Sequence, residues 1–424
     1  MNVRLAYGSR GLDVELPDSC TTVVAPMHHP GAPDEAAALL SALRSPIEGP
    51  PLRELVRPGQ KVAISMCDGT RAQPRQLMIP AVLAEIEGTI DPADVVILVA
   101  TGTHRANTEA EIRAMLGGDL FDRVRVVNHD SRDLDSLVFL GEHGNGVPVW
   151  LNRLWVDADV RITTGFVEPH FFAGFSGGPK MVAPGLAGLE TTLVLHNAAR
   201  IGDPQATWAV TEGNPVHDDI RAATAAALPH FSLDVILNRE QRIITAFAGE
   251  LWTMHRAACR AAREYAMQTV DAPFDVVVTS NSGFPLDQNL YQSVKGMSAA
   301  AKVVKPGGMI VCAAECRDGF PGHGSYRELL SSRGSPQELL EAITASPKVI
   351  PDQWQVQVQA KIQAKATVVM HTDYLSDEEL EQVNLAQTRD IGATVREELA
   401  GLGADATVCV LPEGPQTIPI LAGD

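Results

Sequence analysis

Short apolar runs alternate along the first half of the chain with longer segments whose apolar residues recur at helical spacing. The apolar runs predict strands at 61–65, 94–104, 123–130 and 159–170. The segments 75–87 and 108–117, which lie between them, predict helices. Strands separated by helices are typical of a parallel sheet covered by helices, so this part of the chain is expected to form an α/β domain.

The pattern changes near residue 270. A long helical pattern over 251–270 is followed by a new strand and loop in DAPFDVVVTSNSGFPLDQN. Further strands are predicted in the segments GGMIVCAAE, ATVVMHTD and ATVCVLPEG. The sequence therefore predicts two Rossmann-like α/β domains with mainly parallel sheets, at 1–269 and 270–424.

The composition excludes several classes of protein. Of the 424 residues, 45% are hydrophobic, as in ordinary globular domains, and the formal net charge is −18. Such an acidic chain is not expected to bind nucleic acid or an anionic membrane. No run of about 18 apolar residues predicts a membrane span, and the N-terminal residues do not resemble a signal peptide.

Six cysteines are scattered along the chain, at 20, 67, 259, 312, 316 and 409. They are too few for a disulfide framework and fit a reducing cytoplasm, which is the expected location. Cys312 and Cys316 lie four residues apart, but their segment fits a buried strand and its end better than a metal site.

Polar side chains follow three of the predicted strands. Asp68, Thr70 and Arg71 come after the first apolar run, His104 after the second, and His170 after the fourth. In open α/β sheets ligands bind beyond the carboxyl ends of the strands. We therefore expect these residues to line one crevice.

The segment GFVEPHFFAGFSGGPKMVAPG, residues 165–185, is the least ordinary part of the chain. It is not a Walker phosphate loop, because Pro179 separates Gly178 from Lys180 and Met181 follows the lysine. The chain also lacks the G-x-G-x-x-G dinucleotide fingerprint after its first strand and the H-E-x-x-H zinc motif. The backbone amides of Ser176, Gly177 and Gly178 are expected to be able to bind one phosphate.

Each candidate side chain also has a plainer interpretation. His104 fits a strand-end histidine bonded to backbone, and His196 fits a helix histidine with satisfied hydrogen bonds. His170, between Pro169 and FFAGFSGG, favours a functional role. Lys180 lies in an apolar setting that favours nucleophilicity, although its stem could simply pack while the amine meets water. The other nine histidines are expected in mostly surface or loop positions: 28, 29, 129, 143, 217, 230, 255, 323 and 371.

Five segments together resemble the nickel-pincer lactate racemase family over nearly the whole chain. They are DGTR, ATGTHR, EPHFFAGFSGGPKMVAPG with LHN behind it, DQNLYQSVKGM, and DQWQ. The resemblance implies an isomerase, acting on a short-chain 2-hydroxy acid such as lactate or malate. It also implies a nickel-pincer nucleotide, a pyridinium mononucleotide that carries Ni(II) between two sulfur-containing arms. Maturation enzymes that build this cofactor would be partners.

The resemblance also implies a role for each candidate residue. Lys180 would carry the cofactor covalently and His196 would bind nickel, while His104 and His170 would be the two acid/base residues. Asp68 and Thr70 would contact the cofactor or position Arg71. Arg71 and Lys295 would hold the substrate carboxylate. The pocket in the interdomain cleft would be completed by Tyr291, Gln292, Trp354 and Gln355 from the second domain.

The chemistry of racemisation agrees with these residue types. A hydrogen beside a carboxylate is poorly acidic, so removing it as hydride, which leaves a flat 2-keto acid, is easier than removing it as a proton. Two histidines on opposite faces could exchange the hydroxyl proton near neutral pH. A planar guanidinium suits a carboxylate, and imidazole suits Ni(II).

One departure leaves the substrate open. Lactate racemases tend to carry proline after the arginine of the first motif, whereas this chain has Ala72 and Gln73. Gln73 and Arg75 could reshape the pocket for a larger or dicarboxylic acid such as malate. Two other classes stay in view: a dehydrogenase or hydrolase on the same fold, and a non-catalytic carrier of a metal or nucleotide.

Overall fold

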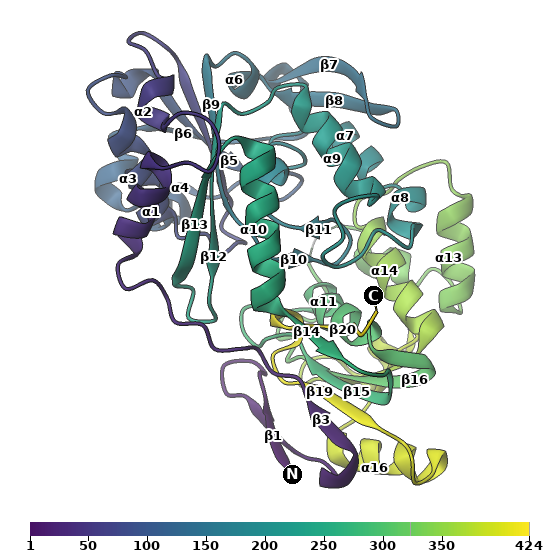
Figure 1. Cartoon of the computed structure of the whole chain (residues 1–424). Helices are drawn as coiled ribbons and strands as arrows, with labels where there is room; N and C mark the ends of the chain where they lie inside the picture. Colours follow the sequence, from purple (N-terminus) through teal and green to yellow (C-terminus); the bar gives the residue numbers. More distant parts are fainter. Residues whose placement is uncertain (323, 424) are drawn as a thin grey trace. The chain divides into compact units, whose positions relative to one another are not determined.

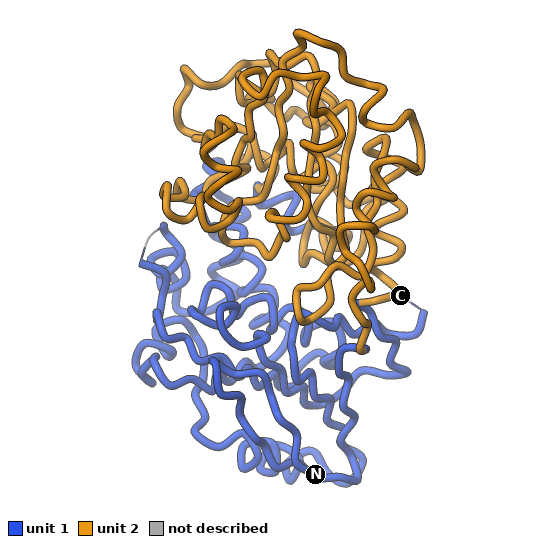
Figure 2. Tube along the Cα trace, turned by 90° about the vertical axis from the view of Figure 1, so that its left-hand side faces the viewer, with its two compact units in different colours: residues 1–27, 197–202, 266–424 blue, residues 28–196, 203–265 orange. Residues whose placement is uncertain are grey.

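The computed structural model describes residues 1–322 and 324–423 and contains two compact units (Figure 2). Unit 1 comprises residues 1–27, 197–202 and 266–424, and unit 2 comprises residues 28–196 and 203–265. Each unit is built around a six-stranded sheet. The predicted α/β class with mainly parallel sheets is confirmed.

The sheet of unit 2 is parallel except at one edge, where β13 runs antiparallel to β12. Its strands, in spatial order, are β13 (Ile243–Gly249), β12 (Phe231–Leu237), β9 (Val160–Phe166), β4 (Val62–Cys67), β5 (Val95–Ala100) and β6 (Arg125–Asn128). Every residue of β4 is buried, as expected for a central strand covered on both faces. Smaller antiparallel pairs are formed by β7 (Leu137–His143) with β8 (Val147–Asn152), and by β10 (Pro169–His170) with β11 (Gly174–Phe175).

Helices cover this sheet from two sides, with α1 and α3 on one side and α9 and α10 on the other (Figure 1). The helices of unit 2 are α1 (Glu35–Arg44), α2 (Leu52–Leu55), α3 (Arg75–Ile86), α4 (Glu109–Leu116), α5 (Gly118–Phe121), α6 (Arg153–Val156), α7 (Leu189–Leu195), α9 (Pro215–Ala225) and α10 (Leu251–Ala266), whose last residue belongs to unit 1. The start of α4 shows why the sequence folds this way locally. Thr108 accepts from the backbone of Glu111, whose side chain accepts from the backbone of Thr108, so two free N–H groups are satisfied.

The sheet of unit 1 is parallel throughout. Its strands, in spatial order, are β18 (Ala386–Gln387), β17 (Thr367–His371), β16 (Val304–Ala313), β15 (Phe274–Ser280), β19 (Val408–Leu411) and β3 (Thr21–Val23). The edge strand β3 comes from the start of the chain and pairs with β19, which lies near its end. Unit 1 therefore needs both ends of the sequence to complete its sheet.

Unit 1 also contains a hairpin, a small parallel pair and several helices. The hairpin is β1 (Asn2–Leu5) with β2 (Leu12–Glu15), and the pair is β14 (Met267–Val270) with β20 (Ile418–Leu421). The helices are α8 (Ala198–Gly202), α11 (Leu290–Ala301), α12 (Tyr326–Leu330), α13 (Pro336–Ala345), α14 (Gln353–Lys365), α15 (Asp377–Glu381) and α16 (Ile391–Leu402).

The helix predicted over 251–270 is too long by four residues. It ends at Ala266, and Met267–Val270 form β14 instead. These residues pair in parallel register with Ile418–Leu421, a tertiary contact that overrides the local helical pattern. No described helix is long and apolar enough to cross a lipid bilayer.

Candidate active site

The candidate residues of unit 2 lie where its sheet changes winding direction. After β4 the chain passes through α3 to β5 on one side, whereas after β9 it leads to β12 on the other side. Ligands in open α/β sheets bind at such a switch point, beyond the carboxyl ends of the strands. Asp68 directly follows β4, His104 follows β5, and the glycine-rich loop with His170 and Lys180 follows β9.

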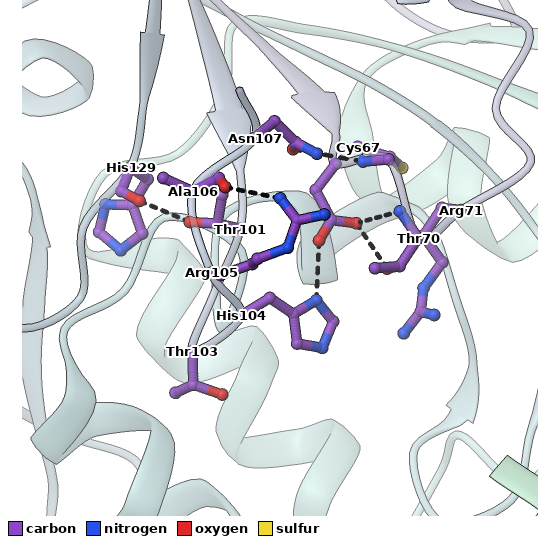
Figure 3. A network of polar contacts seen from close by, with 12 residues as sticks. Cys67, Thr70, Arg71, Thr101, Thr103, His104, Arg105, Ala106, Asn107 and His129 are labelled. Atoms are coloured by element: carbon purple, nitrogen blue, oxygen red, sulfur yellow. Dashed lines mark hydrogen bonds and ion pairs between the residues drawn. The ribbon is translucent and has the colours of Figure 1, made fainter. Parts of the chain in front are cut away.

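Asp68 and His104 form a hydrogen-bonded pair. Nδ1 of His104 lies 2.8 Å from Oδ2 of the buried Asp68, while Oδ1 of Asp68 accepts from the backbone N–H and hydroxyl of Thr70 at 3.2 and 2.7 Å (Figure 3). Burial alone would raise the pKa of Asp68, but the hydrogen bonds and charges of His104, with Thr70 and Arg71, bring that pKa below its usual value. An ionised Asp68 fixes the hydrogen of His104 on Nδ1 and leaves the lone pair on Nε2, so Nε2 can act as a base.

Arg71 lies on the same loop as Asp68 and Thr70. Its side chain points to the same side of the strand ends as the His104 ring (Figure 3). The residue is half-buried. A guanidinium on this loop is suited to binding a small carboxylate.

The ring of Phe172 brings three predicted residues together. The His170 ring meets it edge-on at 4.5 Å between centroids, the His196 ring is perpendicular to it at 5.3 Å, and Nζ of Lys180 lies 5.6 Å from its centre. Residues 171–179 are all buried, whereas Lys180 and His170 are half-buried. The loop and the end of α7 therefore place one amine and two imidazoles around the ring of Phe172.

His196 is oriented as a metal ligand would be. It follows the last residue of α7 and is buried, and its Nδ1 donates to the backbone oxygen of Thr192 at 2.7 Å. This bond places the lone pair on Nε2, in the manner of metal-bound histidines whose other nitrogen donates to a carbonyl. Among the described residues, no three His, Cys, Asp or Glu side chains are grouped to hold an ion.

His170 carries the opposite tautomer to His104. Its Nδ1 accepts from the backbone N–H of Ala173 at 3.3 Å, so in the neutral ring the hydrogen lies on Nε2. In their neutral forms, the two rings therefore present a lone pair at Nε2 of His104 and a hydrogen-bond donor at Nε2 of His170.

Three histidines expected in surface or loop positions are buried instead: His129, His217 and His255. His323 lies outside the described residues. Burial lowers the pKa of His217 to about 3 and that of His255 to about 4, so both are neutral near pH 7. His217 donates through Nδ1 to the backbone oxygen of Ala173, and His255 donates through Nε2 to that of Ser176, at 3.3 and 2.9 Å. Both rings therefore hydrogen-bond to backbone oxygens of the glycine-rich loop.

Two backbone amides proposed for phosphate binding are used within the protein. The Ser176 N–H donates to the backbone oxygen of Glu168 at 2.9 Å, and the Gly178 N–H donates to Oδ2 of Asp234 at 2.7 Å. The prediction that these two amides face a phosphate is wrong, because the loop turns them inward to satisfy its own fold. For the third predicted amide, that of Gly177, phosphate binding stays a prediction.

Asp234 is a buried carboxyl that the sequence analysis missed. It lies in the middle of β12, and a side chain on Gly165 or Gly177 would come within 3 Å of it. Burial raises the pKa of Asp234 to about 7, even though the Gly178 N–H lowers it. Its Oδ1 has no hydrogen-bond partner in the described part of the chain. A lone acidic residue in the apolar run FSLDVIL was the signal that could have identified it.

The candidate residues of unit 1 are grouped on α11 and α14. Tyr291, Gln292 and Lys295 lie on α11, where Nζ of Lys295 donates to Oε1 of Gln292 at 2.9 Å. Trp354 is buried on α14. Its neighbour Gln355, also buried, donates to the backbone oxygen of Tyr291 at 2.5 Å and so ties the two helices together.

Gln73 and Arg75 are buried and hydrogen-bonded within unit 2. Gln73 accepts from the backbone N–H of Cys67 at 2.7 Å and donates to the hydroxyl of Thr164 at 2.8 Å. Arg75 donates only to backbone oxygens of the loop that starts at Cys67. These contacts explain both residues without a larger substrate.

Comparison with known proteins identifies the family. A model described as the lactate racemase N-terminal domain matches residues 7–209, and one described as the lactate racemase C-terminal domain matches residues 269–418. The lactate racemase of Thermoanaerobacterium thermosaccharolyticum is 36% identical over 423 residues, covering 98% of this chain and 99% of that protein. The lactate racemase of Lactiplantibacillus plantarum is 34% identical over 383 residues, covering 90% of each.

Solved structures agree with this assignment. The lactate racemase apoprotein from T. thermosaccharolyticum superposes with a TM-score of 0.93 at 35% identity, covering 99% of this chain and 100% of that one. A protein from Thermotoga maritima shares the fold, with a TM-score of 0.68 at 18% identity over 93% of this chain and 100% of that one. The chain belongs to the lactate racemase family, and thus to the isomerases.

Proposed function

We propose that the protein racemises a short-chain 2-hydroxy acid, with lactate as the first candidate, and that it does so with a nickel-pincer nucleotide attached to Lys180. The observation that carries the proposal is the grouping of His170, Lys180 and His196 around Phe172. The two relatives named lactate racemase support the choice of lactate.

Lys180 and His196 would hold the cofactor. The amine of Lys180 would provide the covalent attachment, and Nε2 of His196 would bind nickel, because Nδ1 is occupied by Thr192. When bound, the cofactor would supply a reversible acceptor for the hydride of the substrate. The apolar ring of Phe172 would keep water from this surface.

His104 and His170 would move the hydroxyl proton. Nε2 of His104 would accept it, since Asp68 holds the hydrogen of that ring on Nδ1. In the complementary step His170 would donate through Nε2 from its protonated ring, because a neutral imidazole is too weak an acid. On protonation, its Nδ1 would give up the contact with the Ala173 N–H. Each histidine would exchange its role when the enantiomer is reversed.

Arg71 would bind the substrate carboxylate, and Thr70 would assist by holding Asp68 in place. The contributions of Lys295, Tyr291, Gln292 and Trp354 to substrate binding stay predictions. Lys295→Met should raise KM for the hydroxy acid if the ammonium is a second carboxylate contact.

Malate is the second candidate substrate. Malate would require a pocket edge reshaped by Gln73 and Arg75, but both side chains are buried and hydrogen-bonded within the protein. Lactate is therefore preferred, and malate belongs in the substrate panel.

The test uses protein coproduced with the maturation enzymes, which we propose as its partners in the cytoplasm. Intact mass, nickel content and chiral analysis of enantiopure 2-hydroxy acids are measured on each variant. Lys180→Ala should lack the adduct, whereas His196→Ala should keep the organic adduct but lose nickel. His104→Ala and His170→Ala should keep both and lose about 10²–10⁴-fold in kcat.

Lys61→Ala, which changes an exposed lysine of the same unit, is the matched control and should retain adduct, nickel and activity. An adduct on Lys180→Ala would refute the attachment site. If His170→Ala loses nickel and His196→Ala keeps it, then His170 is the nickel ligand and His196 the acid/base residue. Turnover by a hydrolytic or dehydrogenase reaction, without racemisation of any hydroxy acid, would overturn the function.

A further inference from the structure

Arg75 makes an unusual set of contacts for a buried cation. It is the first residue of α3, and its guanidinium turns back beneath the loop that follows β4. Nε donates to the backbone oxygen of Cys67 at 2.9 Å and Nη1 to that of Gln73 at 3.1 Å. Nη2 donates to the backbone oxygens of Asp68 and of Arg71, the latter at 2.8 Å. One side chain therefore binds four backbone oxygens, one at the end of β4 and three in the loop that follows it.

The loop held by Arg75 carries the site residues Asp68, Thr70 and Arg71. Two of the four bound carbonyls belong to Asp68 and Arg71 themselves. The side chain of Asp68 orients His104, and the side chain of Arg71 is the proposed carboxylate contact. A shift of this loop would thus move the base and the substrate-binding cation together.

A second tie fixes the same loop to the sheet. Gln73 accepts from the backbone of Cys67 and donates to Thr164, whose hydroxyl donates to the backbone oxygen of Ser65 at 2.8 Å. Ser65 lies in β4 and Thr164 in β9, the two strands at the switch point. The loop is therefore attached at both ends to the strands that define the site.

Burying a guanidinium is costly unless its donors are satisfied. Arg75 is only 7% exposed, and burial lowers its pKa. Four carbonyl acceptors offset that cost only while the loop keeps its present shape, so the charge restricts the loop to one conformation.

We propose that Arg75 is a positioning residue that holds Asp68 and Arg71 in register with His104. Its kinetic consequences rest on the proposed function, but its effect on His104 does not. The side chain need not touch substrate or cofactor, because it acts through the loop backbone.

Arg75→Met keeps an apolar stem of similar length and removes every donor. The loop should relax, so that the Asp68–His104 hydrogen bond is no longer enforced. A displacement of about 1 Å at a reacting group can cost about 10²-fold in rate. We therefore expect kcat to fall by about 10–10²-fold and KM to rise, because Arg71 moves as well. Arg75→Lys should recover only part of the loss, since a single ammonium cannot reach four carbonyls in a fixed fork.

The experiment that does not depend on racemase activity is NMR of the ¹⁵N-histidine-labelled protein without cofactor. His104 is assigned by comparison with His104→Gln. In the unchanged protein its ring nitrogens should report hydrogen on Nδ1, and in Arg75→Met they should report a mixture of tautomers. Kinetics of the holoenzyme variants then measure kcat and KM separately.

Arg161→Met is the matched control. Arg161 also donates to backbone oxygens, those of Leu228 and Ala158 at 2.9 and 3.0 Å, but it lies at the start of β9, at the opposite end of the sheet. Arg161→Met should lower thermal stability without changing the His104 spectrum, kcat or KM. If Arg75→Met does not fold, Thr164→Val removes the second tie of the loop and should shift the His104 tautomer in the same direction.

An unchanged His104 spectrum in a folded Arg75 variant would overturn the proposal. So would equal changes in His104 caused by Arg161→Met, because Arg75 would then act only through general stability. A shifted His104 spectrum in a protein that racemises no hydroxy acid would support the positioning role and refute the proposed function.

Discussion

At the scale of single residues, the orientation of Asp68 makes a sharp prediction. Its Oδ1 is held by two donors of Thr70, so in Asp68→Asn the amide oxygen should take that position and the NH₂ group should face His104. The amide would donate to Nδ1 and move the ring hydrogen to Nε2, which removes the lone pair of the proposed base. We expect kcat/KM to fall by about 10²–10⁴-fold for both enantiomers.

Both enantiomers must be affected equally, because the equilibrium constant of a racemisation is one. Chiral product analysis from each side measures the loss, and intact mass and nickel content should match those of the unchanged protein. Wild-type kcat/KM in a fully loaded Asp68→Asn protein would exclude His104 as an oriented base.

Asp234 makes a prediction about stability and pH. Its pKa in the folded protein is about 7, above the usual value near 4, so the folded state holds a proton that the unfolded state has lost between those pH values. The free energy of unfolding should therefore decrease as pH rises from about 4 to 7, by about 4 kcal/mol at most.

Asp234→Asn should remove this decrease, because the amide oxygen can still accept from Gly178 without ionising. Urea unfolding between pH 5 and 8 measures it, with the exposed Asp135→Asn as a control whose pH dependence should equal that of the unchanged protein. Parallel pH curves for Asp234→Asn and the unchanged protein would contradict a raised pKa.

The location of side chains at strand ends could be predicted from the sequence, whereas the orientation of the loop amides could not. Asp68, His104 and His170 follow apolar runs, so the rule for strand ends predicts their common location. The Gly178 amide is turned inward by Asp234, which is distant in the sequence. The Ser176 amide is turned inward by a backbone oxygen, that of Glu168, which no side-chain pattern reveals. Local spacing carries no information about such partners.

At the scale of elements, the glycine-rich loop requires glycine where His255 supports it. Gly178 has φ of +48°, and an added Cβ would lie 2.3 Å from the His255 ring. Gly178→Ala should destabilise the fold by about 2–5 kcal/mol, from backbone strain and from displacement of a packed ring. Under the proposed function, the displaced loop should also fail to acquire the cofactor adduct at Lys180.

Gly88→Ala separates the two causes. Gly88 has φ of +79°, but nothing lies within 4 Å of the added Cβ, so only backbone strain of about 1 kcal/mol is expected. Urea unfolding of the two variants measures the difference. Equal losses would mean that His255 does not constrain the loop.

Among the elements, strands within continuous apolar runs were predictable and strands defined by distant partners were not. β5, β6 and β9 fall inside predicted runs, and β4 overlaps one and extends two residues beyond it. Burial on both faces explains the apolar sequence of the central strand β4, whereas the edge strand β6 keeps only two valines of its run. β14 continues a helical pattern, and only its pairing with β20 distinguishes it. The periodicity of a segment indicates which of its own residues are buried, but not which strand it pairs with.

At the scale of the whole molecule, the sheet of unit 1 predicts how the chain can be divided. A fragment of residues 266–424 lacks β3 and leaves the edge of β19 unpaired, although all four residues of β19 are buried in the full chain. We expect this fragment to self-associate through that edge. Joining residues 1–27 to its end through a flexible linker should restore a monomer with protected β19 amides.

Size-exclusion chromatography and hydrogen exchange distinguish these outcomes. A linked peptide in which Val24 is replaced by proline is the control, because proline lacks the N–H that Val24 donates to the backbone oxygen of Val410 at 2.8 Å. A monomeric 266–424 fragment with protected β19 amides would show that β3 is dispensable.

The pairing of β3 with β19 also has a consequence for protein synthesis. The first strand of this sheet leaves the ribosome about 385 residues before the last residues of its partner, as Val23 pairs with Val410. At about 5–20 residues per second, the nascent chain carries an unpaired strand for about 20–80 s. Unit 2 is fully translated within that interval, so it can fold while β3 is still unpaired. A chaperone that shields the first 27 residues would therefore have its greatest effect during this interval.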